Sequence, residues 1–351
     1  MSARSTFQMT SGCGCTLMVL AGGILLANQA SGAVVIFVLS VISVFVFAGW
    51  LTALFQMTSG NPQHAIRSWM GWGLTVSELA RRLDLSEQQL INHFPKYIDR
   101  PIPKRSGGTR ILRIPDATTA DIQKRILQRL LPLLTSHRCA TGFEAGLSIV
   151  DNALPHVGQA VVIKLDLVDF FPNTHRDRLE LYFRRIGWGK EAASILVRLT
   201  CDEEGLPQGA CTSPRLSNLV NFLMDEQLDR LAKSRKGVYT RYADDITFSF
   251  PKDYPQRVRG IILKTRWIVR RFGYQLNSKK QLILRQHQRQ SVTGLNVNTK
   301  ACLPRELRRR LRAARHRMKT TGSATWTEEQ LQGWASLESM VESQTASESE
   351  R

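Results

Sequence analysis

The N-terminal part of this 351-residue chain almost lacks charge, because no Asp, Glu, Lys or Arg occurs from Ser5 to Ile66. Within it, the 23 residues of Ala33–Phe55 are apolar apart from two serines, one glycine and one threonine. A helix that rises about 1.5 Å per residue would extend about 35 Å over this run, more than the bilayer hydrocarbon core of about 30 Å. We therefore predict a transmembrane helix, with a buried core helix as the alternative.

A shorter apolar run, Cys15–Ala27, precedes this segment across the turn-like Asn28–Gly32. It predicts a second span that completes a helical hairpin, or alternatively a cleaved secretory signal. A basic body begins at Arg67, and basic segments favour the cytoplasmic side of a membrane. We expect this body to face the cytoplasm and the leader to anchor it.

Paired cysteine motifs are also absent. The six cysteines, at 13, 15, 139, 201, 211 and 302, form no Cys-x-x-Cys pair and no zinc-like spacing with the seven histidines. Structural zinc and a disulfide framework are therefore not expected. Cys13 and Cys15 lie near the apolar leader, where acylation is the alternative to free thiols.

Acidic residues are in the minority, because the chain has 29 Asp and Glu but 48 Lys and Arg, which gives a formal net charge of +19. This balance is expected of a protein that neutralises phosphates. In the basic run Leu303–Lys319, Leu307 and Leu311 are one helical turn apart. The run predicts a helix with one packed edge and a basic exterior, although a charge run is often only a solvated face.

The acidic residues that are present form an informative pattern. Asp244 and Asp245 interrupt the strand-like run Tyr239–Phe250, and the earlier apolar strand within Gln159–Pro172 ends in Asp166. In one antiparallel sheet the three carboxylates would meet and could hold two Mg²⁺ ions. Such ions activate a hydroxyl and neutralise a leaving pyrophosphate. A solvated Asp-Asp turn is the alternative.

Between these strands, Gly205–Asn218 is rich in Gly, Pro and small hydroxyl residues and runs into a helical pattern at Leu219–Asp225. Such a loop lets backbone approach a ligand closely. Alone it would be an ordinary helix cap, but the order of the three elements is informative.

In this order the elements resemble those of reverse transcriptases. Asp166 matches the first catalytic aspartate of that family. The run Leu206-Pro-Gln-Gly209 matches its nucleotide-side loop, and Tyr242-Ala-Asp-Asp245 matches its catalytic hairpin. Lys104–Arg110 looks like the fingers hairpin that holds the incoming triphosphate. Asn277–Lys280 looks like the later motif whose lysine protonates pyrophosphate.

Two further elements, Asn152-Ala-Leu-Pro-His156 and Val292-Thr-Gly294, resemble those of bacterial retron reverse transcriptases. The similarity extends from about Leu74 to Met318. One departure is Cys211, where the family often has proline.

The resemblance implies roles for individual residues. The metal ligands and catalytic carboxylates would be Asp166, Asp244 and Asp245, with Lys280 as the proton donor. The nucleotide would be bound by Lys104, Arg110, Phe171, Gln208 and Gly209, and the Phe171 ring would exclude a 2′-hydroxyl. RNA would be bound by Asn152, His156, Val292, Thr293 and Gly294 and, in the thumb, by Arg308, Arg309 and Arg312.

The resemblance also implies an α+β fold of the right-hand polymerase type, with fingers at about 96–160, a palm at 161–295 and a thumb after 296. Residues 1–60 would form the transmembrane leader, 61–95 a helical N-terminal element, 96–319 the reverse transcriptase domain and 320–351 a polar tail, disordered after Leu337. Leu74–Ile91 predicts two short amphipathic helices with Thr75 or Ser77 and Ser86 as caps. A DNA-reading helix-turn-helix is the alternative.

The implied function is RNA-directed DNA synthesis of the retron type at the bacterial inner membrane. A dedicated structured noncoding RNA would be template and primer, deoxynucleoside triphosphates the substrates, and a branched RNA–DNA the product, in phage defence with the leader as effector or anchor. The alternatives are a group II intron or diversity-generating reverse transcriptase, and a non-catalytic RNA-binding scaffold that restrains a membrane toxin.

Overall fold

The computed structural model describes residues 73–103 and 107–349, with side chains as far as 346. These residues belong to one compact unit, Arg67–Arg351. The predicted membrane leader and Lys104 lie outside the described residues. Within the described ranges, no helix has the length and apolar character needed to cross a bilayer.

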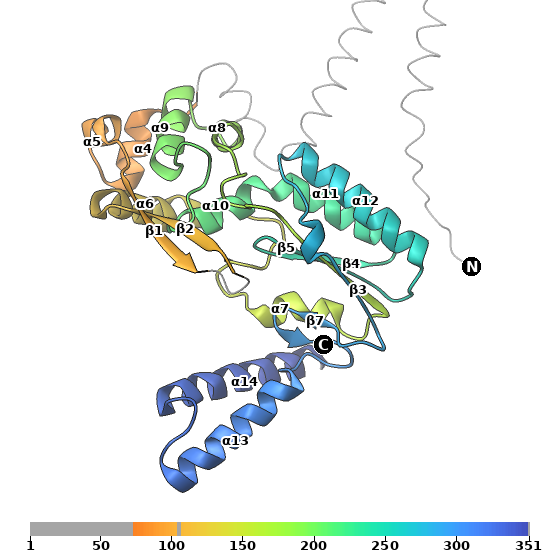
Figure 1. The fold of residues 1–351 in the computed structure, drawn as a ribbon. Coiled ribbons are helices and arrows are strands. Elements are labelled where there is room, and N and C mark those ends of the chain that lie inside the picture. The colour runs from red at the N-terminus through yellow and green to blue at the C-terminus, as the bar shows by residue number, and fades with distance from the viewer. Residues whose placement is uncertain (1–72, 104–106, 350–351) are drawn as a thin grey trace, which may run out of the picture. The chain divides into compact units, whose positions relative to one another are not determined.

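The described helices and strands follow one another as α4 Val76–Leu83, α5 Glu87–Asn92, β1 Tyr97–Pro103, β2 Thr109–Pro115, α6 Ala117–Arg129, η1 Leu131–Leu133, α7 Ile149–Ala153, η2 Leu154–His156, β3 Val161–Asp166, α8 Arg176–Arg185, α9 Lys190–Thr200, α10 Ser213–Val220, α11 Phe222–Lys233, β4 Val238–Tyr242, β5 Asp245–Phe250, α12 Pro255–Arg271, η3 Ser278–Lys280, β6 Leu282–Arg285, β7 Ser291–Val292, β8 Leu295–Asn296, α13 Arg305–Thr321 and α14 Glu328–Ser349 (Figure 1).

The main sheet is antiparallel and has the strand order β4-β5-β3-β6. Successive apolar side chains of β3, one of its two central strands, enter different cores. Val161, Ile163 and Leu165 pack with α11 and α12, which cover one face of the sheet (Figure 1), whereas Val162 packs against α7. The prediction of an α+β fold with β3 and β5 side by side is confirmed.

A second core joins the helical N-terminal element to α6, α8 and α9. Leu79, Leu83 and Leu90 are fully buried in it. Thr75 caps α4 by accepting the backbone N–H of Glu78, and Ser86 forms a capping box with Gln89 at the start of α5. The two predicted helices and the Ser86 cap are therefore confirmed, and Thr75 rather than Ser77 is the first cap.

The third core holds α7, the β7–β8 hairpin and the paired helices α13 and α14. The basic helix has the predicted packed edge, since Leu311 is fully buried and Leu307 partly buried. The expected disorder after Leu337 is wrong. Helix α14 continues to Ser349, because Leu331 and Val341 bury an apolar edge against this core.

The helical pattern predicted at Leu219–Asp225 is broken at Asn221, where α10 gives way to α11. The Asn221 amide donates to the Ser217 carbonyl at 2.8 Å and to the Tyr274 hydroxyl at 2.9 Å, and its oxygen accepts from Arg178 at 2.8 Å. Asparagine side chains compete with the helical backbone in this way. The break lets α11 run across the face of the sheet.

His156 ties the segment after α7 to the strands. Its side chain is fully buried, with Nδ1 2.7 Å from the Ser249 hydroxyl and Nε2 2.8 Å from the Thr240 hydroxyl. Burial lowers the pKa of His156 to about 3. The imidazole is therefore neutral in the folded chain at physiological pH.

This histidine predicts a pH-dependent stability. Below pH about 6.5 the unfolded chain binds a proton at this position that the folded chain does not, so the free energy of unfolding should fall as the pH drops from about 6.5 toward 3. Between pH 6.5 and 5 the loss should be about 2 kcal/mol. Urea unfolding of the wild type and of His156→Asn at pH 6.5 and pH 5 measures this loss of unfolding free energy. An equal loss in the two proteins would show that His156 is not its cause.

Candidate active site

Three carboxylates converge at one end of the main sheet. Asp166 is the last residue of β3, and it lies directly opposite Asp245, the first residue of β5. Residues so paired on antiparallel strands have their Cα atoms about 4.5–5.5 Å apart and their side chains on one face. Asp244 precedes β5, and its carbonyl accepts the backbone N–H of Leu167 at 3.0 Å. The predicted meeting of these three residues is confirmed.

The carboxylates repel one another in a partly desolvated setting. Burial, followed by the charge of Asp245, raises the pKa of Asp244. Burial and the charge of Asp166 raise the pKa of Asp245, against the opposing effect of Lys164 and Lys280. A divalent cation relieves this repulsion, and carboxylate oxygens are the donors that Mg²⁺ prefers. The donor set therefore fits the predicted metal.

Lys280 is the cation nearest to this cluster. Its ammonium group donates to Asp166 Oδ1 at 2.7 Å, and this hydrogen bond raises the pKa of Lys280. The neighbouring Asn277 donates its backbone N–H to the Asp166 carbonyl at 2.8 Å. The Asn277–Lys280 turn is thus fixed to the end of β3, and Lys280 lies beside the three carboxylates.

The hairpin that carries Asp244 is held by a buried ion pair. Arg241 donates to both oxygens of Asp225 at 2.7 Å, and both side chains are fully buried. The Tyr239 hydroxyl also donates to Asp225, at 2.6 Å. A further Arg241 N–H donates to the carbonyl of Ala243 at 3.0 Å, and Ala243 has a φ of 57°. This clamp fixes the left-handed turn that aims Asp244, and the sequence offered no signal for it.

The residues predicted to bind the nucleotide lie on several segments of the chain. Phe171 is partly exposed, five residues after Asp166, with its ring centroid 5.4 Å from Phe170. The Gln208 carbonyl accepts the backbone N–H of Arg113 at 2.8 Å, which joins the loop to β2. Arg110 is exposed on β2, and Lys104 lies outside the described residues.

The structure explains why residue 209 is a glycine without reference to the nucleotide. Its φ is +134°, and a Cβ there would lie 2.8 Å from the carbonyl oxygen of Arg113. The glycine therefore makes room for the backbone of β2 and for its own left-handed conformation. Space for a nucleotide is not needed to explain it.

Phe143 is a site residue that the sequence analysis missed. It is 43% exposed and has a φ of 65°, with ring centroids 6.1 Å from Phe171 and 6.2 Å from Tyr242. Its loop is held by Asn218, whose amide donates to the Gly142 carbonyl at 2.6 Å and to Glu144 at 2.7 Å. Only the tertiary structure brings this aromatic side chain to the catalytic hairpin.

The two short elements predicted to bind RNA lie in the third core. Asn152, His156 and Val292 are 1%, 0% and 0% exposed, so their side chains pack inside the fold, and RNA binding by these elements stays a prediction. Asn152 accepts the Thr141 hydroxyl at 2.8 Å, and the Thr293 hydroxyl donates to the Ile149 carbonyl at 2.9 Å. Gly294, with a φ of 84°, closes the β7–β8 turn. Apolar residues of the same segments, among them Val292, pack in one core with α13 and α14.

The basic helix α13 presents the predicted arginines to solvent. Arg309 and Arg312 are exposed, and Arg308 is partly buried. The same helix carries Arg310, whose guanidinium lies 5.2 Å from the ring centroid of Trp326. The exposed edge of α13 is therefore strongly positive.

A possible metal cluster away from the carboxylates was not expected from sequence spacing. His137, Cys139 and Asp229 place one potential ligand atom each within 4.8 Å of one another. Asp229 already accepts from Lys233 at 2.6 Å and from Arg138 at 3.1 Å, while His137 contacts Glu226 at 3.1 Å. The cluster is therefore satisfied as an ion-pair network.

Comparison with known proteins agrees with this geometry. Residues 102–297 match the family model described as reverse transcriptase (RNA-dependent DNA polymerase). The chain is 38% identical over 239 residues to the Retron Mx65 reverse transcriptase of Myxococcus xanthus, covering 63% of this chain and 55% of that protein. It is 34% identical over 305 residues to the Retron Mx162 reverse transcriptase of the same organism, covering 77% and 62%.

The Retron Ec86 reverse transcriptase of Escherichia coli is 32% identical over 256 residues, covering 71% of this chain and 78% of that protein. The chain thus spans 55% and 62% of the two Myxococcus relatives and more of the Escherichia one. Because the family model covers more than half of its residues, and because retron enzymes match at this level, the chain belongs to the reverse transcriptase family, among its retron-type members.

Proposed function

We propose that this chain is an RNA-directed DNA polymerase of the retron type. The observation that carries the proposal is the register of β3 and β5, which sets Asp166 opposite Asp245 beside Asp244 and Lys280. A structured noncoding RNA would be both template and primer, with synthesis from an internal 2′-hydroxyl and a branched RNA–DNA as the product. Membership of the retron-type family supports this choice over a group II intron or diversity-generating enzyme.

Asp166, Asp244 and Asp245 would hold two Mg²⁺ ions. When bound, the ions activate the attacking hydroxyl and neutralise charge on the departing pyrophosphate. The chain's own contribution is to fix the three carboxylates before substrate arrives. The β3–β5 register and the Arg241–Asp225 clamp supply that preorganisation.

Lys280 would give its proton to the leaving pyrophosphate. Its raised pKa keeps the ammonium group protonated at neutral pH, because Asp166 accepts a hydrogen bond from it. The side chain is also 57% exposed, so it can swing toward a departing anion. Arg110 on the β1–β2 hairpin, together with Lys104, would hold the triphosphate.

The aromatic pair Phe171 and Phe143 would line the sugar pocket. A Phe171 ring beneath the sugar leaves no room for a 2′-hydroxyl, so deoxynucleotides would be preferred. Gln208, which the hydrogen bond to Arg113 fixes near β2, would contact the nucleotide or the template base pair. Arg308, Arg309 and Arg312 of α13 would neutralise RNA phosphates.

The apolar leader would attach the enzyme to the bacterial inner membrane, with the described body in the cytoplasm. The support for this is the apolar run Ala33–Phe55 and the basic body that begins at Arg67. The resemblance to retrons extends the proposal to phage defence, with the leader as membrane effector or as anchor.

Polymerisation should depend on Asp244. Asp244→Asn removes one metal-binding charge, which should lower the rate of deoxynucleotide addition by about 10³-fold or more. Primer extension on an RNA template with Mg²⁺ measures the effect. Asp169→Asn is the matched control, because Asp169 is exposed and outside the cluster.

A non-catalytic scaffold is the competing function. It would keep phage protection in cells that carry Asp244→Asn, and it would yield copurified RNA without attached DNA. Either result would remove the case for polymerase chemistry. Loss of both DNA and protection in this variant alone would support the enzyme.

Sugar selection should depend on Phe171. Phe171→Ala should raise the ratio of ribonucleotide to deoxynucleotide incorporation about tenfold or more, because the 2′-hydroxyl then meets no ring. Single-nucleotide addition with matched substrates gives the ratio. Phe94→Ala, at an aromatic residue 66% exposed beside Arg198, is the control. An unchanged ratio in Phe171→Ala would show that another residue makes the selection.

Membrane attachment should depend on the apolar run. The full chain should sediment with membranes and resist carbonate extraction, whereas Val44→Asp combined with Val46→Asp should release it, at a cost of about 3 kcal/mol per buried charge. Val44→Leu with Val46→Leu is the matched control. Equal sedimentation of both double variants would exclude a spanning role for this run.

A further inference from the structure

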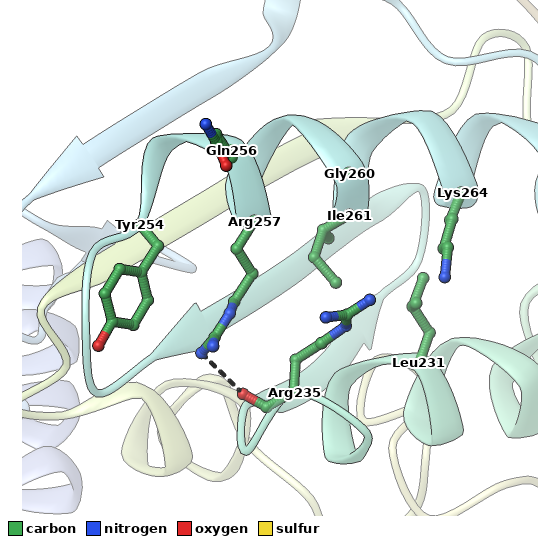
Figure 2. A pocket seen from close by; sticks show the side chains of 8 residues that line it. All are labelled: Leu231, Arg235, Tyr254, Gln256, Arg257, Gly260, Ile261 and Lys264. Atoms are coloured by element: carbon green, nitrogen blue, oxygen red, sulfur yellow. Dashed lines mark hydrogen bonds between the residues drawn. The ribbon is translucent and has the colours of Figure 1, made fainter.

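A basic pocket lies between α11 and α12, on the helical layer that covers the sheet. It has a volume of about 380 Å³. Arg257 and Lys264 reach into it from α12, and Arg235 reaches up from the turn after α11 (Figure 2). Tyr254, just before α12, closes one end (Figure 2).

The three cations have no acidic partner in the pocket. Its lining consists of Leu231, Arg235, Tyr254, Gln256, Arg257, Gly260, Ile261 and Lys264, which include no Asp or Glu. Within this set, Arg257 donates a hydrogen bond of 3.4 Å to the backbone carbonyl of Arg235 and stacks on the ring of Tyr254. Three uncompensated charges that converge on one hollow attract an anion.

Gly260 opens the pocket at a cost to its helix. A glycine inside a helix is about 1 kcal/mol less favourable than alanine. At Gly260 a Cβ would meet no atom within 4 Å, and no positive φ requires glycine here. Packing and backbone conformation therefore do not explain the residue, whereas the space that it leaves is part of the pocket.

Tyr254 adds a flat surface beside the charges. Its ring is 46% exposed, and the Arg257 guanidinium lies 4.6 Å from the ring centroid. On the same helix the 61% exposed Trp267 carries Arg271 at 4.7 Å in the same way. Exposed aromatic rings with stacked guanidinium groups are surfaces on which unpaired bases stack.

We propose that this pocket binds single-stranded RNA, with one base stacked on the Tyr254–Arg257 platform and its flanking phosphates held by Arg235, Arg257 and Lys264. It is a second RNA site, apart from the carboxylates. The proposal rests on the proposed function only in that the chain works on RNA. The pocket would hold an unpaired segment of the template RNA while the active site copies another.

A concave site with an exposed ring favours RNA over a membrane surface. Phosphate groups occur in both, but only nucleic acid adds a planar base that the platform can stack. Membrane-binding surfaces instead project apolar side chains into the lipid. The cations here converge in a hollow, as Figure 2 shows.

The test uses the full chain with Asp244→Asn, so that binding is read without polymerisation. The probe is a fluorescent oligouridylate of 12 nucleotides, and its anisotropy is measured over a range of salt concentrations. Arg235→Gln, Arg257→Gln and Lys264→Gln together should lower the slope of log affinity against log salt by about 2 in magnitude, since each single-strand phosphate contact contributes about 0.7. Tyr254→Ala should weaken binding about tenfold, the effect of losing one stacked base.

The matched control removes three exposed cations elsewhere, with Arg81→Gln, Arg129→Gln and Lys190→Gln. Equal weakening by the two triple variants would overturn the proposal, because net charge alone would then explain the effect. Gly260→Leu fills the pocket and keeps every charge, so it should weaken binding, whereas Gly260→Ala should have a smaller effect and stabilise the helix. Unchanged binding in Gly260→Leu would also overturn the proposal.

Two further arms separate the sources of phosphate. Phosphatidylglycerol vesicles replace the probe in a sedimentation assay, and every protein in this arm also carries Val44→Asp and Val46→Asp so that the apolar leader does not itself bind the vesicles. If the pocket variants lose vesicle binding and keep RNA binding, the site is a membrane contact and the proposal fails. Inorganic phosphate at millimolar concentration should displace the oligonucleotide only weakly, and displacement as effective as that by unlabelled oligonucleotide would exclude base stacking.

If the chain with Asp244 intact makes no DNA while the pocket binds RNA as expected, the polymerase proposal fails and the pocket proposal survives.

Discussion

The pairing of β3 with β5 is the constraint on which the remaining structure depends. Asp166 faces Asp245 only in this register, and a slip of one residue would turn every side chain of a strand to the other face of the sheet. Such a slip would turn Asp166 toward the core formed with α11 and α12 and remove from that core Ile163, which is fully buried in it. The apolar cores therefore fix the register, and the register fixes the carboxylates.

The carboxylates in turn make this end of the sheet electrostatically unfavourable. Burial and mutual repulsion raise the pKa of Asp244 and Asp245, so the fold must hold them together by other contacts. The buried Arg241–Asp225 ion pair is one of these contacts, since Arg241 also binds the carbonyl of Ala243, next to Asp244. Loss of either partner would leave an unpaired buried charge, so the pair is retained in the folded chain. Lys280 balances the cluster from the solvent side. The contacts that fix the hairpin thus also hold the three carboxylates close together.

In the third core, α7 and the β7–β8 hairpin support the helices α13 and α14. The segments around Asn152 and Val292 have the composition of recognition motifs, yet their side chains are buried. Their function in the fold is to join the palm to α13 and α14, whose exposed arginines face solvent. A substitution of a buried residue in these segments would therefore disturb the packing of α13 and α14 on the rest of the fold.

The sequence by itself determined the three aspartates, the apolar strands that bring them together, the capped helices at Thr75 and Ser86 and the basic helix with its packed leucines. Periodicity, capping and strand patterns are local, so they can be recognised without coordinates. Only the tertiary structure decided the roles of His156, Phe143 and the Arg241–Asp225 pair. Each of these depends on burial or contact between residues far apart in the chain, which no local pattern encodes. The α14 helix was missed for the same reason, because a polar segment with a few spaced apolar residues becomes helical once a partner core buries them.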